Sequence, residues 1–398
     1  MLPRLMAMLL LAGCAAAPHA LNAAPTSTPA GTPPGEPLPA GICVAPGGWA
    51  NASARPVDTS DLLRRAAQAP AVLLGERHDS PEHHRWQLHT LAALYALNPH
   101  LAIGMEMFPR RVQPALDRWT AGTTTESEFL KESEWQKVWG YDAQLYLPIL
   151  HFARMNRIPV VALNVERGLV SRTAREGWAA IPPAEREGVG EPAPPPPSYL
   201  ERLQEAMAAH GPNQRESQGF QRFVEAQSVW DRAMAERIAD THRDTGRTVV
   251  AILGMGHVEG RDGVPHQLAA LGIDDALVLL PWDADRPCDS LDGKLADAVY
   301  GLGTGIQTAE VPRPRLGVML EPGQGGVQVR SVMEGSVAAA AGLTAGDLVV
   351  AAAGTPVRQA SDLTAVVQRQ APGTWLPLTV KRAKGTQELV AKFPADAP

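Results

Sequence analysis

Short apolar runs in this sequence end in side chains that could carry out acid–base or ligand-binding chemistry. The runs cover residues 71–74, 101–108, 158–164 and 248–253. The polar residues at or just beyond their ends are Glu76, His78, Glu106, Asn164 and His257. Carboxylates and imidazoles together can bind a divalent metal, activate water as a general base, or surround a polar ligand. The sequence contains no HExxH, CxxC or GxSxG motif, so it leaves these three possibilities open.

Runs of this length, bounded by turn residues and helical patterns, predict buried strands. A fifth run covers residues 276–280, and a mainly helical insertion is expected over about 165–245. Strands that alternate with helices predict an α/β fold with a mostly parallel sheet flanked by helices. The carboxyl ends of parallel strands meet at one edge of a sheet, where ligands bind. We therefore expect the five polar residues to lie together at that edge.

Two details of the later strands bear on the same edge. Gly254 and Gly256 precede His257, and glycines there allow unusual backbone angles and the close approach of a partner. Gln227 and Asp231 form an i, i+4 pair near the edge of the apolar face of a long predicted helix. His83 and His84 are adjacent on another helix, so they point about 100° apart and are not a matched ligand pair.

The N-terminal residues predict an exported protein. Residues 1–14 combine a basic start with an apolar stretch too short to span a bilayer. The closing sequence Leu11-Ala12-Gly13-Cys14 resembles the bacterial lipobox, which implies lipidation of Cys14. With Ala15 next, the resemblance implies an outer-membrane lipoprotein that faces the periplasm of a Gram-negative bacterium. Residues 15–42, rich in alanine, proline and threonine, predict a flexible linker.

Charge and cysteine content add two expectations. A formal net charge of -6 gives no electrostatic argument for a nucleic-acid partner. Beyond Cys14 the chain has two cysteines, Cys43 and Cys288, near the two ends of the α/β region. In an exported protein such a pair predicts a disulfide, with two unpaired thiols as the alternative.

Five motifs along the α/β region form a set. They are Gly75–Asp79, Gly104–Phe108, Tyr146–Leu150, Ala226–Asp231 followed by Met234-Ala235, and Gly254–His257. Together they resemble the ChaN family of haem-binding uptake lipoproteins, within the wider Tiki/erythromycin-esterase superfamily. The resemblance covers about Asp58 to Leu280. It implies an α/β domain with a helical subdomain, and haem held at a homodimer interface through a tyrosine with a histidine nearby.

The implied haem ligand is not settled by the sequence. Tyrosinate is a known axial ligand of haem iron. Tyr141 and Tyr146, which precede the third strand, are the candidates, and Tyr146 is the weaker one if Leu145 and Leu150 belong to the core. No Cys-x-x-Cys-His motif is present, which excludes covalent attachment of haem.

The resemblance leaves two alternatives to haem binding. In the first, the protein is a hydrolase in which four residues polarise a water molecule, with or without a divalent metal. Those residues would be Glu76, His78, Glu106 and His257. In the second, the α/β domain is catalytically silent and the protein is an adaptor of the cell envelope.

The C-terminal residues, 315–394, show a different pattern. Short strand-like runs accompany the motifs Leu316–Met319, Gly335–Leu343 and Thr344–Val350. They closely resemble a PDZ domain of the bacterial periplasmic-protease type, which implies that a peptide C-terminus adds to the sheet as a further strand. By that resemblance Leu316, Gly317 and Val318 receive the peptide carboxylate. Between the α/β domain, placed at 43–290, and this module, a helix-like stretch to about residue 302 and a loop predict a linker over 291–314.

Overall fold

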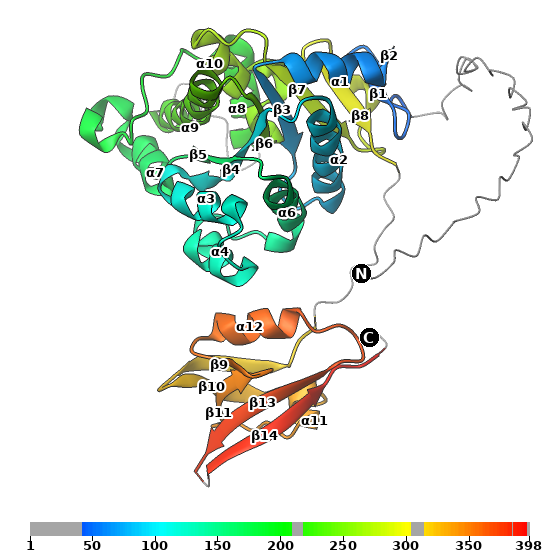
Figure 1. Ribbon diagram of the computed structural model, residues 1–398. Coiled ribbons are helices and arrows are strands. Elements are labelled where there is room, and N and C mark those ends of the chain that lie inside the picture. The colour runs from blue at the N-terminus through cyan, green and yellow to red at the C-terminus, as the bar shows by residue number, and fades with distance from the viewer. Residues whose placement is uncertain (1–41, 209–217, 304–313, 384, 396–398) are drawn as a thin grey trace, which may run out of the picture.

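The computed structural model describes residues 42–208, 218–303, 314–383 and 385–395. The predicted signal segment, Cys14 and the linker up to residue 41 lie outside the described residues. Within the described ranges, every helix is too short or too polar to cross a membrane. Two separate β-sheets organise the chain, one formed by residues before 304 and the other by residues after 313 (Figure 1).

The first sheet has eight strands in the order β2-β1-β8-β7-β3-β6-β4-β5. Their bounds are β1 (Trp49–Ala50), β2 (Pro56–Val57), β3 (Ala71–Glu76), β4 (Leu101–Pro109), β5 (Val160–Asn164), β6 (Thr248–Gly254), β7 (Leu277–Trp282) and β8 (Ala298–Gly301). Neighbours from β8 to β5 are parallel, whereas β1 and β2 add antiparallel pairs at one edge. The predicted α/β class with a mostly parallel sheet is confirmed.

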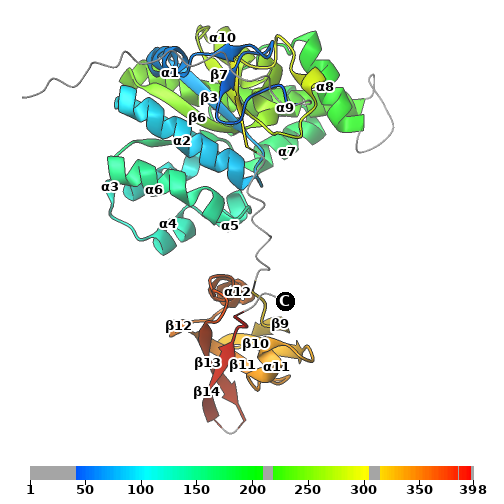
Figure 2. The same cartoon turned by 90° about the vertical axis from the view of Figure 1, so that its right-hand side faces the viewer.

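Side chains of the central strands alternate between two hydrophobic cores. Val72 and Leu74 of β3 belong to one core, and Ala71 and Leu73 belong to the other. The first core is covered by α1 (Thr59–Gln68), α2 (Pro81–Leu97), α3 (Gln113–Ala121), α4 (Glu126–Glu132), α5 (Trp135–Val138) and α6 (Leu147–Asn156), and the second by α9 (Gln218–Thr245) and α10 (Val264–Ala270) (Figure 2). A sheet buried on both faces leaves its strand ends as the places where polar side chains can gather.

The expected insertion between β5 and β6 is helical, with α7 (Arg167–Glu176) and α8 (Pro197–Ala208) ahead of α9. Leu169 of α7 packs against Val229 and Ala233 of α9. Tyr199 of α8 packs against Phe220 at the start of α9. The insertion therefore rests on α9, and α9 in turn covers the sheet.

The helix-like reading of residues 289–302 is wrong. Residues Ala298–Gly301 form β8, which pairs in parallel with β7, so the sheet extends beyond residue 290. Four residues are too few to show a strand period, and the alanines nearby favour helix when read alone. The two-residue strands β1 and β2 escape sequence analysis for the same reason.

The second sheet is antiparallel, in the order β14-β13-β11-β10-β9, with β12 beside β11. The strands are β9 (Val318–Gly323), β10 (Gly326–Val332), β11 (Leu348–Ala352), β12 (Thr355–Pro356), β13 (Trp375–Arg382) and β14 (Gly385–Lys392), with the helices α11 (Val337–Ala340) and α12 (Ala360–Gln368). A core of its own, which includes Val327, Leu363 and Leu378, holds this unit together. Strand β9 is an edge strand, and α12 packs along it.

Candidate functional site

Strands β3, β6, β4 and β5 are consecutive neighbours, so their carboxyl ends lie side by side. Direct contacts then join the polar residues expected there. Glu76 contacts His78, and Glu106 lies 3.5 Å from the Nε2 atom of His257. Asn164 donates a hydrogen bond of 2.9 Å from its amide to the carbonyl of Glu106. The structure therefore brings all five residues to one edge of the sheet.

Glu76 is the centre of the first group of contacts. Its carboxylate is 2% exposed, and Oε1 accepts hydrogen bonds of 2.8 Å from Nδ1 of His78 and from the hydroxyl of Tyr146. Oε2 lies 2.8 Å from Nδ1 of His84. Burial alone would raise the pKa of Glu76, but the contacts with His78 and His84 lower it to about 2. Glu76 is thus a buried anion at neutral pH, hydrogen-bonded through Oε1, while Oε2 lies at ion-pair distance from His84 without a hydrogen-bond donor among the described residues.

Tyr146 serves this anion as a hydrogen-bond donor. Its side chain is fully buried beside Leu150, which matches the expectation of a packed residue at the start of α6. Burial raises the pKa of the phenol far above its ordinary value, and the charge on Glu76 raises it further. A phenol held in its neutral form and enclosed in the core is poorly suited to bind iron as tyrosinate.

His257 is the centre of the second group. Its Nδ1 atom donates a hydrogen bond of 2.6 Å to Oδ1 of Asp231 on α9, and Tyr199 of α8 donates to the other oxygen of Asp231. Burial lowers the pKa of His257, but the charges on Glu106 and Asp231 more than offset this and raise it to about 9. At neutral pH His257 is therefore an imidazolium between two carboxylates.

Gly254 joins the two groups. Its amide donates a hydrogen bond of 2.6 Å to Oε2 of Glu106, and a Cβ atom added to it would lie 2.7 Å from Cε1 of His78. The expected close approach of a partner is confirmed, and the partner is His78. The expected unusual backbone angle is wrong, because φ of Gly254 is an ordinary -58°. Glycine is required here by the space between strand end and imidazole.

The protonation states restrict what the site can do. Burial lowers the pKa of His78, but the hydrogen bond to Glu76 and the charge on Glu106 raise it above its ordinary value. The His257 imidazolium can donate a proton and hydrogen bonds, so it is not itself the base of a hydrolysis at neutral pH. Among the residues described, no three His, Cys, Asp or Glu side chains are arranged to hold a metal ion.

Tyr141 lies on the solvent side of the same group. Its side chain is 40% exposed, and its ring centroid lies 5.3 Å from that of His78 and 5.5 Å from that of Trp139. The ring of Trp139 in turn meets His78 edge to face at 4.7 Å. An accessible phenol and a partly exposed imidazole thus lie side by side next to Glu76, and both pack against the buried indole of Trp139.

Sequence analysis missed His84 and Tyr199 as contributors and did not assign Asp231 to the site. His84 was set aside because it adjoins His83, yet the divergence of neighbours on a helix is what directs one of them to the site. His83 instead lies 3.1 Å from Asp283. Both histidines therefore reach the carboxyl ends of the strands, because Asp283 follows β7 and His83 also accepts a hydrogen bond from the amide of Arg77, which follows β3.

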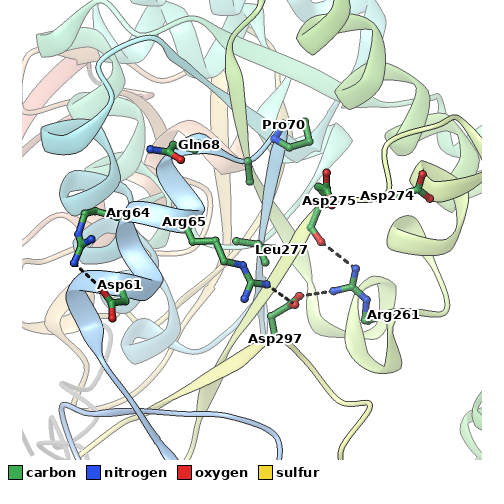
Figure 3. Close-up of a pocket in the computed structure, with 12 residues that line it drawn as sticks. Asp61, Arg64, Arg65, Gln68, Pro70, Arg261, Asp274, Asp275, Leu277 and Asp297 are labelled. Carbon is green, nitrogen blue, oxygen red and sulfur yellow. Dashed lines mark hydrogen bonds and ion pairs between the residues drawn. The ribbon is translucent and has the colours of Figure 1, made fainter.

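Two pockets open at opposite ends of the sheet. One, of about 440 Å³, lies at the carboxyl ends of β4 and β5 and includes Asn164 and Trp139 in its wall. The other, of about 580 Å³, lies at the amino ends of β3 and β7 (Figure 3). In the second pocket Arg65 and Arg261 both pair with Asp297, so its charges are directed at one another. Only the first pocket adjoins the predicted residues.

The two cysteines of the α/β region lie side by side. The thiol of Cys43 hydrogen-bonds with that of Cys288, and this contact raises the pKa of the Cys288 thiol. The structure holds no bond between the two sulfur atoms. The Cys43–Cys288 disulfide stays a prediction, now with the two thiols in place for it.

Two parts of the chain match known protein families. Residues 62–268 match the family described as haem-binding uptake, Tiki superfamily, ChaN, and residues 328–382 match the PDZ domain. No protein of the curated set matches the chain. Asn164 and the four titratable residues of the sheet edge all fall within the first match.

Three solved structures illustrate the likeness. A structure described as cofacial haem binding to ChaN of Campylobacter jejuni covers 63% of this chain and 95% of its own, at 18% identity and a TM-score of 0.52. The HtrA3 PDZ domain bound to a phage-derived ligand covers 20% of this chain and 83% of its own, at 21% identity and a TM-score of 0.19. An erythromycin esterase, EreC, covers 56% of this chain and 72% of its own, at 13% identity and a TM-score of 0.37. At such identities the first likeness shows the fold, and the other two carry no argument by themselves.

The first family match spans just over half of the chain, and the chain therefore belongs to the ChaN family of haem-binding uptake proteins in the Tiki superfamily and carries a PDZ domain besides.

Proposed function

We propose that this protein binds haem at the carboxyl edge of its parallel sheet, with Tyr141 as the iron ligand and His78 beside it. One observation carries the proposal. Of the two candidate tyrosines, Tyr141 is 40% exposed next to His78, whereas Tyr146 is fully buried and donates to Glu76. When bound, ferric haem accepts a tyrosinate oxygen as an axial ligand. The residues around Tyr141 fit such a ligand, because the partly exposed imidazole of His78 lies beside it and the buried ring of Trp139 packs against both rings.

The other polar residues at the carboxyl ends of the strands would hold Tyr141 and His78 in position. Glu76 orients His78, while Glu106, Asn164 and His257 brace the neighbouring strand ends through the contacts described above. Since ChaN of Campylobacter jejuni binds haem cofacially, we extend the proposal to a homodimer in which exposed Tyr141 surfaces of two copies come together. The protein would then change from monomer to dimer when haem is added.

The test is a titration of the chain that begins at residue 15 with haemin. We expect a saturable change in the Soret and charge-transfer bands for the unchanged chain and for Tyr146→Phe. Tyr141→Phe should lose the charge-transfer band, because a phenylalanine provides no oxygen to the iron. Sedimentation of the same samples measures the dimer. Equal spectra for all three proteins, or a loss confined to Tyr146→Phe, would sink the assignment of Tyr141.

A hydrolase is the second candidate, and the pair of Asp231 and His257 beside Glu106 favours it. In that case Glu106 would accept the proton of water, and the His257 imidazolium would donate one to the leaving group. Screening with chromogenic esters separates the two functions. Turnover that is lost in Glu106→Gln and kept in Tyr141→Phe would support hydrolysis. Absence of both turnover and haem binding would leave the envelope adaptor.

The PDZ domain would dock a partner through the C-terminus of a peptide. The loop before β9 is fixed by two hydrogen bonds, from Ala338 to the carbonyl of Leu316 and from Met333 to the carbonyl of Gly317. Gly317 has a φ angle of 77°, a backbone conformation that residues other than glycine rarely adopt. We propose that this loop, completed by Val318, receives the peptide carboxylate. The peptide FGRWV serves as the probe, and its amidated form should bind at least about tenfold more weakly, since it lacks the charge.

For the N-terminus we propose lipidation at Cys14 and an outer-membrane location that faces the periplasm. The lipobox-like residues 11–14 support this proposal. Labelled palmitate should enter the unchanged protein and not Cys14→Ala. A protein that fractionates with soluble periplasmic contents in both forms would contradict the anchor.

A further inference from the structure

We infer that the pocket at the carboxyl ends of β4 and β5 holds carboxylate groups at the edge of the ligand, with Arg167 as their main partner. The inference rests on the proposed haem function, because haem is a flat apolar ring that carries two propionate carboxylates at one edge. The pocket, of about 440 Å³, combines an apolar wall that includes Met107, Val165 and Val170 with a charged rim. Such a combination suits a ligand that is apolar and anionic at once.

The rim of this pocket is positively charged. It contains Arg111, Lys137 and Arg167 against the single carboxylate of Glu166, although the whole chain has a formal net charge of -6. Arg111 is occupied by Glu134 and Glu166. Lys137 is paired with Glu134 at 3.0 Å. Both of these cations are therefore already neutralised in part.

Arg167 differs from the other two cations. Its guanidinium is exposed and donates a hydrogen bond of 3.2 Å to the backbone carbonyl of Trp139. In the part of the chain that the structure covers, no carboxylate lies within ion-pair distance of it. A guanidinium has five N–H donors in a planar fork that matches a carboxylate, so most of its donors remain for a ligand.

The backbone around Arg167 favours an anion as well. Arg167 is the first residue of α7, a helix of ten residues, and the side chain of Glu166 at its N-cap forms no capping hydrogen bond. The first amides of such a helix carry partial positive charge and lack intrahelical acceptors. Glu166 is instead turned to Arg111. The guanidinium thus directs positive charge to the pocket beside the start of α7, where the N-cap amide of Glu166 already donates to the carboxylate of Glu187.

Two tryptophans connect this pocket with the haem surface. Trp139 forms part of the pocket wall, and its ring also contacts those of Tyr141 and His78. A ligand that covers Tyr141 therefore lies near Arg167, with the buried Trp139 between the two. Trp230 lines the same pocket, and its buried Nε1 atom has no hydrogen-bond partner among the described residues. A ligand oxygen would supply the acceptor that this donor lacks.

The test uses metal-free protoporphyrin IX and its dimethyl ester as probes, so that iron plays no part. Fluorescence titration is made with the full chain, with Arg167→Gln, and with Arg175→Gln as the matched control on the exposed part of the same helix. We expect Arg167→Gln to weaken binding of the free acid roughly tenfold to a hundredfold, and Arg175→Gln to leave it unchanged. The dimethyl ester should bind weakly and equally to all three proteins. Equal binding of acid and ester to the unchanged chain, or no effect of Arg167→Gln, would overturn the inference.

Haemin spectra on the same proteins separate the two proposals. If Arg167→Gln weakens binding of the free acid while no haemin charge-transfer band appears, the Tyr141 function fails and the carboxylate pocket stands. If Tyr141→Phe abolishes that band while Arg167→Gln has no effect on either probe, the pocket fails and the function stands. If neither porphyrin binds to the unchanged chain, both proposals are overturned.

Discussion

The two edges of the parallel sheet differ in what surrounds their charges. At the carboxyl edge Glu76 and Glu106 are at most 2% exposed, and each is held by donors from other elements. At the amino edge Asp61 and Arg64 pair with each other while their side chains are 70% and 64% exposed. The amino edge has the larger pocket, of about 580 Å³ against about 440 Å³ (Figure 3).

The difference shows that burial of the charged side chains, more than the volume of the adjacent pocket, makes a charged cluster chemically distinctive. Water screens the exposed pair, so the energy of its interaction is small. In the low-dielectric interior the same kinds of charge shift one another's pKa, as Glu76 and His257 show. Clusters of that kind gather at functional sites. Four experiments test this difference between the two edges.

The largest effect should come from removing a charge at each edge in turn. Glu76→Ala leaves His78 and Tyr146 without their shared acceptor and His84 without its ionic partner, so we expect the free energy of unfolding to fall by about 3–5 kcal/mol. Asp61→Ala removes an exposed partner and should cost less than about 1 kcal/mol. Urea unfolding monitored by circular dichroism measures both. Similar costs for the two variants would show that the edges do not differ as described.

The next effect concerns a covalent bond near the carboxyl edge. Cys288 follows the end of β7, and its thiol hydrogen-bonds with that of Cys43. If the protein is oxidised, a disulfide should form and raise the free energy of unfolding by about 2–4 kcal/mol. Mass analysis after alkylation without reduction detects the bond, and the double variant Cys43→Ser, Cys288→Ser provides the control. Two alkylated thiols in protein from an oxidising compartment would refute the disulfide.

The third effect is the response of stability to pH. His257 has a folded-state pKa of about 9, above its ordinary value of 6.5, so its contribution is complete below pH 6.5 and is lost as the pH rises through 9. Glu76 has a lowered pKa of about 2, so its contribution is present above pH 4.5 and is lost as the pH falls toward 2. The loss on the alkaline side should be smaller than that of Glu76→Ala, because a neutral imidazole keeps one hydrogen bond.

Urea midpoints measured at intervals from pH 6 to pH 10 test the alkaline side. His257→Gln should flatten the decline between pH 6.5 and pH 9, while Asp61→Ala at the other edge should leave it in place. A decline of equal size in His257→Gln would mean that some other group is responsible. Direct titration of the His257 ring by nuclear magnetic resonance would then identify where its proton is lost.

Much of the carboxyl edge follows from sequence, because β3, β4, β6 and β7 are buried on both faces and are mostly apolar, so that Glu76 and Glu106 stand out in them. Once these strands are parallel, topology alone gathers the residues that end them. The contributions of His84 and Tyr199 do not follow in this way. They depend on how α2 packs on the sheet and α8 packs on α9, which periodicity within one element does not determine.

The choice between the two tyrosines shows the same limit. Tyr141 and Tyr146 are five residues apart in one connecting segment, and the local sequence predicts that Tyr146 is packed only if its leucine neighbours belong to the core. Tyr146 is enclosed because α6 packs its start against the strand end that carries Glu76, whereas Tyr141 precedes that helix. The sequence therefore predicts which tyrosines could bind iron, but it does not predict which of them is exposed to solvent.

The smallest effect should come from one methyl group at the junction of the two buried clusters. In Gly254→Ala the added Cβ would lie 2.7 Å from Cε1 of His78, closer than side chains tolerate, so His78 must move away from Glu106. We expect a cost of about 1–3 kcal/mol in unfolding free energy. Gly256→Ala is the matched control, since an added Cβ there meets nothing within 4 Å. The imidazole signals of His78 should shift in the first variant alone. If both variants behave alike, the close contact between His78 and the end of β6 does not hold the cluster together, and the carboxyl edge loses its tightest point of difference from the amino edge.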